Sequence, residues 1–310
     1  MPEQRSYAVV ITAAPGARVL DEAARLAVAT AMAPHLVIEN RWLAEGEAFE
    51  ILFAAGDAVA LAPVKAAITQ ALGARPVDIN IIDDDLAHRR KKLLVADMDS
   101  TIIQQECIDE IADVIGLKPK IAGITERAMR GELQFEDALR ERLGLLKGIG
   151  TADLERVFRE RVTLMPGAKT LIATMRKNGA YTALVSGGFT FFTNRVRVAT
   201  GFDVDHSNTL GLADGKLTGE VDGPILGKEA KLATLEHYRT SRGLFATDTL
   251  AVGDGANDLM MIKAAGLGVA YRAKPIVAAE AAASITHGDL TALLYLQGYR
   301  REEFAQAISS

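Results

Sequence analysis

Four short apolar runs in the second part of the chain constrain the fold most. They are LLVAD (93–97), YTALVSGG (181–188), TLAVGD (249–254) and LGVAY (267–271), and segments with helical spacing separate them. Runs of this kind, which end in small or acidic residues, are typical of strands buried on both faces of a parallel sheet. Ligands of such sheets collect at the carboxyl ends of the strands. The runs therefore predict an α/β fold built on a Rossmann-like, doubly wound parallel sheet.

The stretch between the first two runs is far longer than one crossover helix needs. Segments 118–130, 135–147 and 151–162 are amphipathic with helical spacing, and Thr151 is placed to cap the last of them. We interpret this stretch as a helical cap at about 116–165 that is inserted after the first strand and covers the strand ends.

The first 84 residues follow a different pattern. Strands are expected over 6–13, 36–43, 47–54 and 77–82, and helices over 21–33 and 62–72. This β-α-β-β-α-β order is that of the ferredoxin-like motif, so we expect a small α+β domain over 1–84 and a second domain over 85–310. Residues 83–92 (DDDLAHRRKK) have no apolar face and predict an exposed linker. Since the motifs described below all follow this linker, residues 85–310 are expected to fold without the first domain.

The composition fits a soluble two-domain chain and excludes several classes of protein. The chain has 310 residues, of which 49% are hydrophobic and 24% charged, enough for buried cores without disulfides or a structural metal. Its 35 basic and 40 acidic residues give a net charge of −5, which disfavours nucleic-acid binding through phosphate contacts. Cys107 is the single cysteine, and no apolar stretch reaches the roughly 18–20 residues of a membrane span. We therefore expect a cytoplasmic protein that binds neither nucleic acid nor membrane.

Two carboxylates follow the first apolar run directly, Asp97 and Asp99 in the sequence DMDST (97–101). At a strand end they project into the same crevice, where they repel each other unless a cation lies between them. Oxygen ligands of this kind suit a hard divalent cation such as Mg²⁺. Acidic residues after strands also cap helices and turns, so the pentapeptide alone leaves that interpretation open.

A second acidic cluster, GDGAND (253–258), follows the third run and supplies Asp254 and Asp258. Its glycines would permit a tight turn, and its carboxylates would add oxygen ligands at the same sheet edge. A calcium-binding EF-hand loop would require a glutamate at its last position, but Ala265 stands there. The two clusters together predict a divalent metal site.

Two further features lie between these clusters. Ser186 and Gly187 begin the SGG sequence at the end of the second run, where a hydroxyl and backbone N–H groups before a helix could hold a phosphate. An ordinary strand–helix turn explains this sequence equally well. Lys231 lies on a helix before the strand that leads to Asp254, where it could neutralise phosphate charge. On its own, a lysine on a helix is more often a surface residue.

In this order and on these strand ends, DMDST, SGG, Lys231 and GDGAND resemble the four motifs of the haloacid dehalogenase-like phosphatases, over roughly 93–290. Longer stretches closely resemble the bacterial phosphoserine phosphatases of that superfamily. They are DMDSTIIQQECIDEIAD (97–113), FEDALRERLGLLKG (135–148) and VGDGANDLMMIKAAG (252–266). The N-terminal segment is similar to the ACT-type domain that is often attached to these enzymes.

The resemblance implies that O-phospho-L-serine is hydrolysed to L-serine and phosphate, the last step of serine biosynthesis. Asp97 would form an aspartyl-phosphate, and Asp99 would protonate the leaving oxygen and then deprotonate the attacking water. Mg²⁺ would be held by Asp97, by a backbone carbonyl beside Asp99 and by Asp254, with Asp258 in the same acidic cluster. The phosphoryl oxygens would be bound or oriented by Ser186, Gly187, Lys231 and Asn257.

Substrate choice would depend on the residues that enter and form the cap. Glu106 matches the family position that meets the substrate ammonium, and Arg142 matches the position that binds the carboxylate. Judged by spacing alone, both would be taken for solvated helix faces. Arg140 is close in sequence and is the alternative to Arg142. Cys107 is expected to be a packing residue and not a reactive thiol.

Several alternatives remain open at this point. A phosphotransferase that moves the phosphoryl group from phosphoserine to another hydroxyl acceptor would share every motif. A signalling receiver module also phosphorylates an aspartate on a doubly wound sheet, but it lacks this motif spacing and the cap. An ion-pumping ATPase would need membrane spans. The N-terminal domain could bind an amino-acid effector or mediate a homodimer, and no set of residues in the sequence decides between the two.

Overall fold

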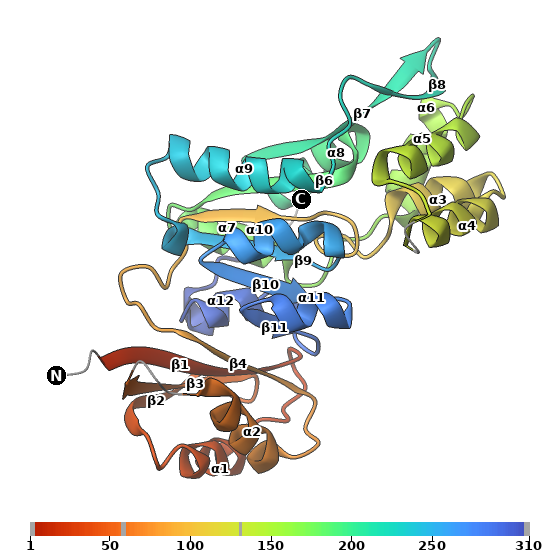
Figure 1. The fold of residues 1–310 in the computed structure, drawn as a ribbon. Coiled ribbons are helices and arrows are strands. Elements are labelled where there is room, and N and C mark those ends of the chain that lie inside the picture. The colour runs from red at the N-terminus through yellow and green to blue at the C-terminus, as the bar shows by residue number, and fades with distance from the viewer. Residues whose placement is uncertain (1–3, 57–59, 130–131, 307–310) are drawn as a thin grey trace.

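The computed structural model describes residues 4–56, 60–129 and 132–306. Within these ranges the chain forms a four-stranded sheet near the N-terminus and a seven-stranded sheet in the rest of the molecule. In Figure 1 the four-stranded sheet lies below the seven-stranded one. The predicted combination of a small α+β part and a larger α/β part is confirmed.

The seven-stranded sheet has the order β11-β10-β9-β5-β6-β7-β8. Its strands are β5 (Leu93–Ala96), β6 (Tyr181–Phe189), β7 (Val204–Ala213), β8 (Lys216–Asp222), β9 (Thr249–Gly253), β10 (Leu267–Tyr271) and β11 (Ala283–Ile285). Neighbours from β11 to β7 pair in parallel, and only β8 runs antiparallel to its neighbour. The four apolar runs are β5, β6, β9 and β10. Because the strand order reverses at β5, the carboxyl ends of β5, β6 and β9 border one crevice.

Helices cover both faces of this sheet (Figure 1). They are α7 (Ala168–Lys177), α8 (Thr190–Thr200), α9 (Lys228–Ser241), α10 (Leu259–Ala264), α11 (Pro275–Glu280) and α12 (Ala292–Leu296). Leu94 of β5 belongs to a core cluster with residues of α7, α8 and α12, whereas its neighbour Val95 belongs to a cluster with α9, α10 and α11. Alternate residues of one strand are therefore buried on opposite faces, as a doubly wound sheet requires. In the described part of the chain, no helix has the length and apolar content to cross a membrane.

The cap lies between β5 and β6, at the carboxyl ends of the strands (Figure 1). It consists of α3 (Cys107–Val114), α4 (Lys118–Met129), α5 (Phe135–Leu145) and α6 (Thr151–Arg161). The expected helices over 118–130, 135–147 and 151–162 are confirmed, although position 130 lies outside the described residues. The predicted role of Thr151 as helix cap is wrong. Gly150 is the N-cap residue, and the Thr151 backbone N–H donates to the Gly215 carbonyl at 2.9 Å, so a contact with a distant turn sets where α6 begins.

The β7–β8 hairpin, which the sequence did not reveal, extends from the sheet to the cap (Figure 1). The Gly148 N–H donates to the Leu217 carbonyl and the Leu217 N–H to the Ile149 carbonyl, both at 2.8 Å. Gly219 has a φ of +86°, and a Cβ atom there would lie 3.1 Å from the Lys147 side chain. Backbone hydrogen bonds thus tie the α5–α6 connection to the edge of the sheet.

The N-terminal sheet is antiparallel with the order β2-β3-β1-β4. Its elements are β1 (Gln4–Ala13), α1 (Glu22–Ala31), β2 (Leu36–Ala44), β3 (Ala48–Gly56), α2 (Leu61–Leu72) and β4 (Val77–Asp83). Val9, Ile51 and Phe53 on one face form a core with Val28 of α1 and Ile68 of α2. The β-α-β-β-α-β order and this strand order are those of a ferredoxin-like fold, as predicted.

The opposite face of the N-terminal sheet packs on the rest of the molecule. Ala8, Val10 and Leu52 belong to the same core cluster as Leu290 and Tyr295. Polar contacts lie beside this shared core. The Asp78 carboxylate accepts hydrogen bonds from the backbone N–H groups of Thr286, His287 and Gly288, and Asn80 exchanges two hydrogen bonds with the Ser284 backbone. The two sheets therefore share one hydrophobic core, while a domain boundary at 84/85 stays a prediction.

Residues 83–92 are only in part the exposed linker that their composition predicted, because most of them are exposed but Asp84 and Arg89 are buried. Arg89 is only 6% exposed and donates to Asp84 at 2.8 Å and to Glu50, which is itself fully buried. Arg41 also pairs with Glu50, at 2.5 Å. Composition alone did not reveal this pairing, because Glu50, on β3, is distant from Arg89 in the sequence. Buried charges that are paired in this way are costly to separate.

This shared core reverses the expectation for a protein that lacks residues 1–84. Such a protein would expose the apolar surface around Leu290 and Tyr295 and would leave Arg89 without Glu50 and Asp84. We expect residues 85–310 alone to be poorly soluble and to unfold at a lower temperature than the full chain, because exposed apolar surface and an unpaired buried charge both destabilise the folded state. Differential scanning calorimetry and sedimentation of both proteins would measure this. A truncated protein with the thermal stability of the full chain would show that the shared core contributes little.

Candidate active site

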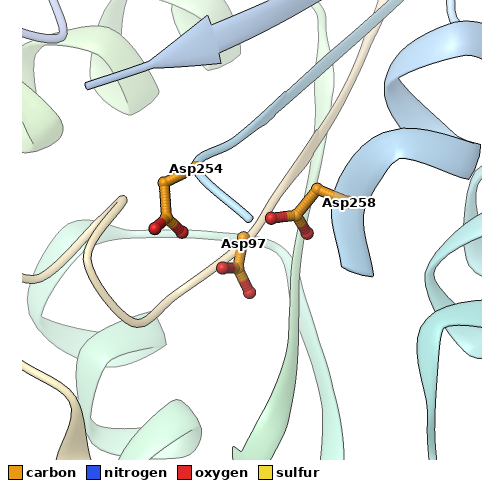
Figure 2. Close-up of side chains that lie close together, drawn as sticks. All are labelled: Asp97, Asp254 and Asp258. Atoms are coloured by element: carbon orange, nitrogen blue, oxygen red, sulfur yellow. The ribbon is translucent and has the colours of Figure 1, made fainter. Parts of the chain in front are cut away.

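Three carboxylates meet at the carboxyl ends of β5 and β9. Asp97 follows β5, Asp254 follows β9, and Asp258 ends the short 3₁₀ turn Ala256–Asp258. Figure 2 shows the three side chains pointing toward one another, and one oxygen of each lies within 4.8 Å of those of the other two. The structure therefore joins the two acidic clusters that the sequence places far apart.

Lys231 lies within this group of acids and is only 2% exposed. Its ammonium donates to Asp97 Oδ1 at 2.5 Å and to Asp258 Oδ1 at 2.6 Å. Burial alone would lower the pKa of Lys231, but the two carboxylates outweigh burial and raise it. The interpretation of Lys231 as a surface lysine is excluded. Its positive charge instead offsets part of the repulsion between Asp97 and Asp258.

The acidic cluster nevertheless keeps an excess of negative charge. Burial and the nearby charge of Asp258 raise the pKa of Asp97 and bring that of Asp254 to about 6, and Lys231 opposes both shifts only in part. Asp258 has both oxygens engaged, one by Lys231 and the other by the Gly255 N–H at 3.0 Å. The oxygen donors of Asp97 and Asp254 therefore fit a hard divalent cation best, with Asp258 anchoring the lysine and the turn.

The glycines of GDGAND lie in a tight turn, as predicted, and what they supply there is space. Neither Gly253 nor Gly255 has a positive φ. A Cβ atom on Gly253 would lie 2.3 Å from Asp258 Cγ, and one on Gly255 would lie 2.2 Å from Asn257 Oδ1. Glycine here gives the Asp258 and Asn257 side chains room to fold back onto the backbone, and the turn needs no left-handed residue.

Asp99 is held separately from the three-carboxylate group. Its Oδ1 accepts the backbone N–H of Cys107, at the start of α3, at 2.9 Å, and its Oδ2 accepts the Ser186 hydroxyl at 3.0 Å. Burial raises the pKa of Asp99, and these two hydrogen bonds oppose the shift. A fixed carboxyl whose pKa is raised is suited to general acid–base work. Cys107 is buried, which raises the pKa of its thiol and agrees with a packing role.

The SGG sequence lies in the last part of β6, which ends at Phe189, and α8 begins at Thr190, so the segment ends a strand and precedes a helix as predicted. Ser186 is buried, and its Oγ accepts the Gly188 N–H at 2.8 Å. A Cβ atom on Gly187 would lie 3.2 Å from Cζ of Phe135, the first residue of cap helix α5. The hydroxyl of this segment therefore faces Asp99, while Phe135 covers its backbone.

A cavity of about 180 Å³ joins these groups to the cap. Of the predicted site residues, its lining includes Asp97, Asp99, Glu106, Arg142, Ser186, Gly187, Asp254 and Asn257. Arg142 is partly buried, whereas Arg140 is exposed and lies 3.6 Å from Asp137 on the same helix. The structure therefore brings Arg142, and not Arg140, to the cavity.

Two opposite charges lie on the cap side of the cavity. Burial and the charge of Asp99 raise the pKa of Glu106 to about 7. Burial lowers the pKa of Arg142, and Asp109 and Glu106 oppose that shift. A ligand that carries both an ammonium and a carboxylate would match this pair.

Sequence reasoning missed several residues that contact the site. Lys274 lines the cavity but carries no motif signal, and Phe135, which also lines it, begins the FEDALRERLGLLKG stretch but had no assigned role. Ser100 belongs to DMDST and had no assigned role, yet its hydroxyl donates to Glu106 Oε1 at 2.7 Å. Its φ of +56° is a costly left-handed conformation for a residue other than glycine. The Ser100 hydroxyl therefore fixes one oxygen of Glu106, which lines the cavity.

Comparison with known proteins identifies the family. The model of the haloacid dehalogenase-like hydrolases matches residues 94–263, more than half of the chain. The chain belongs to this family. It is 41% identical over 245 residues to a phosphoserine phosphatase from Streptomyces coelicolor, with 79% of this chain and 60% of that protein aligned. It is 46% identical to a phosphoserine phosphatase from Polaromonas sp., with 70% of this chain and 94% of that protein aligned.

A solved structure extends the similarity to the N-terminal sheet. The probable phosphoserine phosphatase from Vibrio cholerae superposes with a TM-score of 0.75 and 31% sequence identity. The superposition covers 95% of this haloacid dehalogenase-like chain and 86% of that one. By contrast, the chain spans less than two thirds of the length of the Streptomyces coelicolor relative.

Proposed function

We propose that this hydrolase converts O-phospho-L-serine into L-serine and phosphate, as the last step of serine biosynthesis in the cytoplasm. One observation carries the proposal. A single small cavity presents Glu106 and Arg142 on its cap side and Asp97 and Asp99 at the strand ends. The first pair matches the ammonium and carboxylate of serine, and the second can perform phosphoryl transfer. The names of the relatives from Streptomyces coelicolor and Polaromonas sp. support it.

The cap residues select the substrate. Arg142 receives the substrate carboxylate, because a guanidinium can donate two parallel hydrogen bonds to the two carboxylate oxygens. Glu106 accepts hydrogen bonds from the ammonium. The Ser100 hydroxyl already holds Glu106 Oε1, so the orientation of the acceptor is set before the substrate arrives. Bringing an ammonium close to Glu106 also favours its ionised form.

The reaction divides into two displacements at phosphorus. In the first, a carboxylate oxygen of Asp97 forms a bond to phosphorus while the bond from phosphorus to the seryl oxygen breaks, and Asp99 gives its proton to that oxygen. In the second, Asp99 takes a proton from water, and the water oxygen bonds to phosphorus as the bond to Asp97 breaks. Phosphate leaves and both carboxyls return to their starting states.

The remaining residues position the phosphoryl group and stabilise its charge. Ser186 and Gly187 supply a hydroxyl and a backbone N–H, Lys231 supplies a positive charge next to Asp97, and Asn257 supplies an amide at the cavity wall. Donors fixed before the reaction stabilise developing charge at little reorganisation cost. Phosphoryl transfer depends mainly on such positioning and charge stabilisation.

The oxygen donors fit Mg²⁺, which we propose is held by Asp97, by the backbone carbonyl beside Asp99 and by Asp254. When bound, the ion would neutralise charge on these carboxylates and on the phosphoryl group. Asp258 contributes indirectly, because its oxygens hold Lys231 and the Gly255 N–H.

The N-terminal sheet has two proposed roles, an amino-acid effector site or a homodimer contact. Light scattering of the full chain with and without L-serine separates them. A dimer that forms both with and without serine supports the homodimer contact. A change in activity caused by serine bound at a saturable site outside the cavity supports the effector site.

The proposal is tested by phosphate release from a panel of phosphorylated metabolites with and without Mg²⁺. We expect phosphoserine to have the highest kcat/KM, because it alone pairs with both Glu106 and Arg142. Treatment with EDTA should abolish turnover, and added Mg²⁺ should restore it, because the acidic cluster is left unbalanced without a cation. Equal rates across the panel, or full activity in EDTA, would contradict the proposal. Transfer of phosphate to an added amino alcohol in preference to water would identify a phosphotransferase instead.

A further inference from the structure

The pairing of β6 with β7 is interrupted at the SGG sequence. Val185 pairs with His206 and Phe189 with Asn208, so three residues of β6 lie opposite a single residue of β7. Such bulges free backbone groups from the ladder and are common beside active sites. Here the interrupted residues are Ser186, Gly187 and Gly188, and a side chain of β7 bonds the Gly187 carbonyl in place of a ladder partner.

That side chain is Asn208, which is 1% exposed and does not line the cavity. Its Nδ2 donates to the Gly187 carbonyl at 2.9 Å and to the Leu226 carbonyl at 3.4 Å, and its Oδ1 accepts the Leu226 N–H at 2.7 Å. Since the Leu226 N–H can only donate, the amide orientation follows from the network. Asn208 therefore connects the SGG segment to the loop that precedes α9.

The first connection leads to Asp99 through a chain of hydrogen bonds. The Gly187 carbonyl and the Gly188 N–H belong to one planar peptide group, so fixing one fixes the other. The Gly188 N–H donates to Ser186 Oγ at 2.8 Å, and the Ser186 hydroxyl donates to Asp99 Oδ2 at 3.0 Å. Every bond in this chain points the same way, and hydrogen bonds in such chains strengthen one another.

The second connection leads to Lys231. Leu226 is followed by Gly227, the N-cap residue of α9, and Lys231 lies in the first turns of that helix. Holding both the N–H and the carbonyl of Leu226 therefore fixes where the helix begins. Asn208 thus links β6, which carries Ser186, to the start of α9, which carries Lys231.

We propose that Asn208 is a positioning residue for the phosphate half of the site, acting through the Gly187–Gly188 peptide and the start of α9. The inference rests on the proposed function and adds a residue to it. Removing the amide frees this peptide to rotate, which displaces the Ser186 hydroxyl and the Gly187 backbone. Glu106 and Arg142, on the cap, should be unaffected. The substitution is therefore expected to weaken the binding of phosphate and not the binding of serine.

The experiment compares Asn208→Ala with Asn80→Ala in the full chain with Mg²⁺. Asn80 is a matched control because it is also buried and also bridges a backbone N–H and carbonyl, those of Ser284, in the contact between the two sheets. For Asn208→Ala we expect kcat/KM to fall about ten- to a hundredfold, as for other residues that orient site groups. The inhibition constant of inorganic phosphate should rise by a similar factor, while that of L-serine stays within about twofold. Asn80→Ala should lower only the melting temperature.

A second variant separates positioning from packing. Asn208→Asp keeps the size of the side chain and the acceptor for the Leu226 N–H, but it can donate to the Gly187 carbonyl only when its carboxyl is protonated. Its activity relative to the original protein should therefore rise as the pH falls, whereas the relative activity of Asn208→Ala should stay level. This readout also decides the matter if Asn208→Ala fails to fold.

Unchanged phosphate inhibition in either folded variant, with only a lower melting temperature, would overturn the role of Asn208. Calorimetric binding of inorganic phosphate in the presence of Mg²⁺ keeps this inference distinct from the proposed function. If the original protein binds phosphate but does not hydrolyse phosphoserine, the proposed function fails. Weaker phosphate binding by Asn208→Ala in that case would still support the positioning role.

Discussion

Asp97→Asn is expected to abolish phosphoserine turnover, because an amide cannot act as the nucleophile. The loss should be on the order of 10⁶-fold in kcat, the size seen when a hydrolase loses its nucleophile. The fold should persist, since an amide oxygen at this position can still accept the hydrogen bond from Lys231 that Asp97 Oδ1 accepts at 2.5 Å. Steady-state phosphate release and intact-protein mass spectrometry of the quenched enzyme would measure turnover and the aspartyl-phosphate.

Asp113→Asn is the matched control for this variant. Asp113 lies on α3, close in sequence to the site, but it is exposed and pairs with Arg161 at 2.5 Å. The same chemical change there should leave turnover unchanged, because exposed ion pairs contribute little. Detection of a covalent phosphoenzyme in Asp97→Asn would contradict the assignment of Asp97.

The strands and the acidic cluster could be predicted because their signals are local. A strand buried on both faces must be apolar throughout, so β5, β9 and β10 stand out as runs. Parallel strands place their carboxyl ends at one edge, which brings Asp97 and Asp254 together although they are far apart in the sequence. The general position of the site followed from these facts.

Residues whose environment depends on distant parts of the chain could not be predicted from composition. Arg89 belongs to a run that looked solvated, and only the fold brings Glu50 to it. Asn208 has no motif around it, and its role depends on a bulge in the ladder between β6 and β7. Thr151 has the side chain of a helix cap, but the β7–β8 hairpin supplies the carbonyl of Gly215 to its backbone instead.

Glu106 and Arg142 fall between these cases. Their spacing on helices is that of ordinary solvated residues, and only the resemblance to a known family singled them out. The structure supports the choice, since both line the cavity and Arg140 is exposed. Glu106 is the N-cap residue before α3 and Arg142 lies on α5, so each cap element contributes one residue and the pair has no periodic signal of its own.

Arg142→Ala is expected to lower kcat/KM for phosphoserine roughly thirtyfold to a few thousandfold. The guanidinium is partly buried and lines the cavity, so its pair with the substrate carboxylate would be shielded from water. Truncating one member of such a pair costs about 2–5 kcal/mol. Phosphoethanolamine carries the phosphate and the ammonium but no carboxylate. Its weak hydrolysis should therefore be nearly unchanged, and the kcat/KM values for the two substrates should converge.

Two comparisons make the test of Arg142 specific. Arg140→Ala, on the same helix but exposed, should leave the kcat/KM values for both substrates unchanged. Glu106→Gln should lower both, because both substrates carry the ammonium. Equal losses of kcat/KM for phosphoserine and phosphoethanolamine in Arg142→Ala would mean that the arginine stabilises the cap or binds the phosphate. It would then not bind the carboxylate. Convergence in Arg140→Ala instead would show that the other cap arginine is the one that binds it.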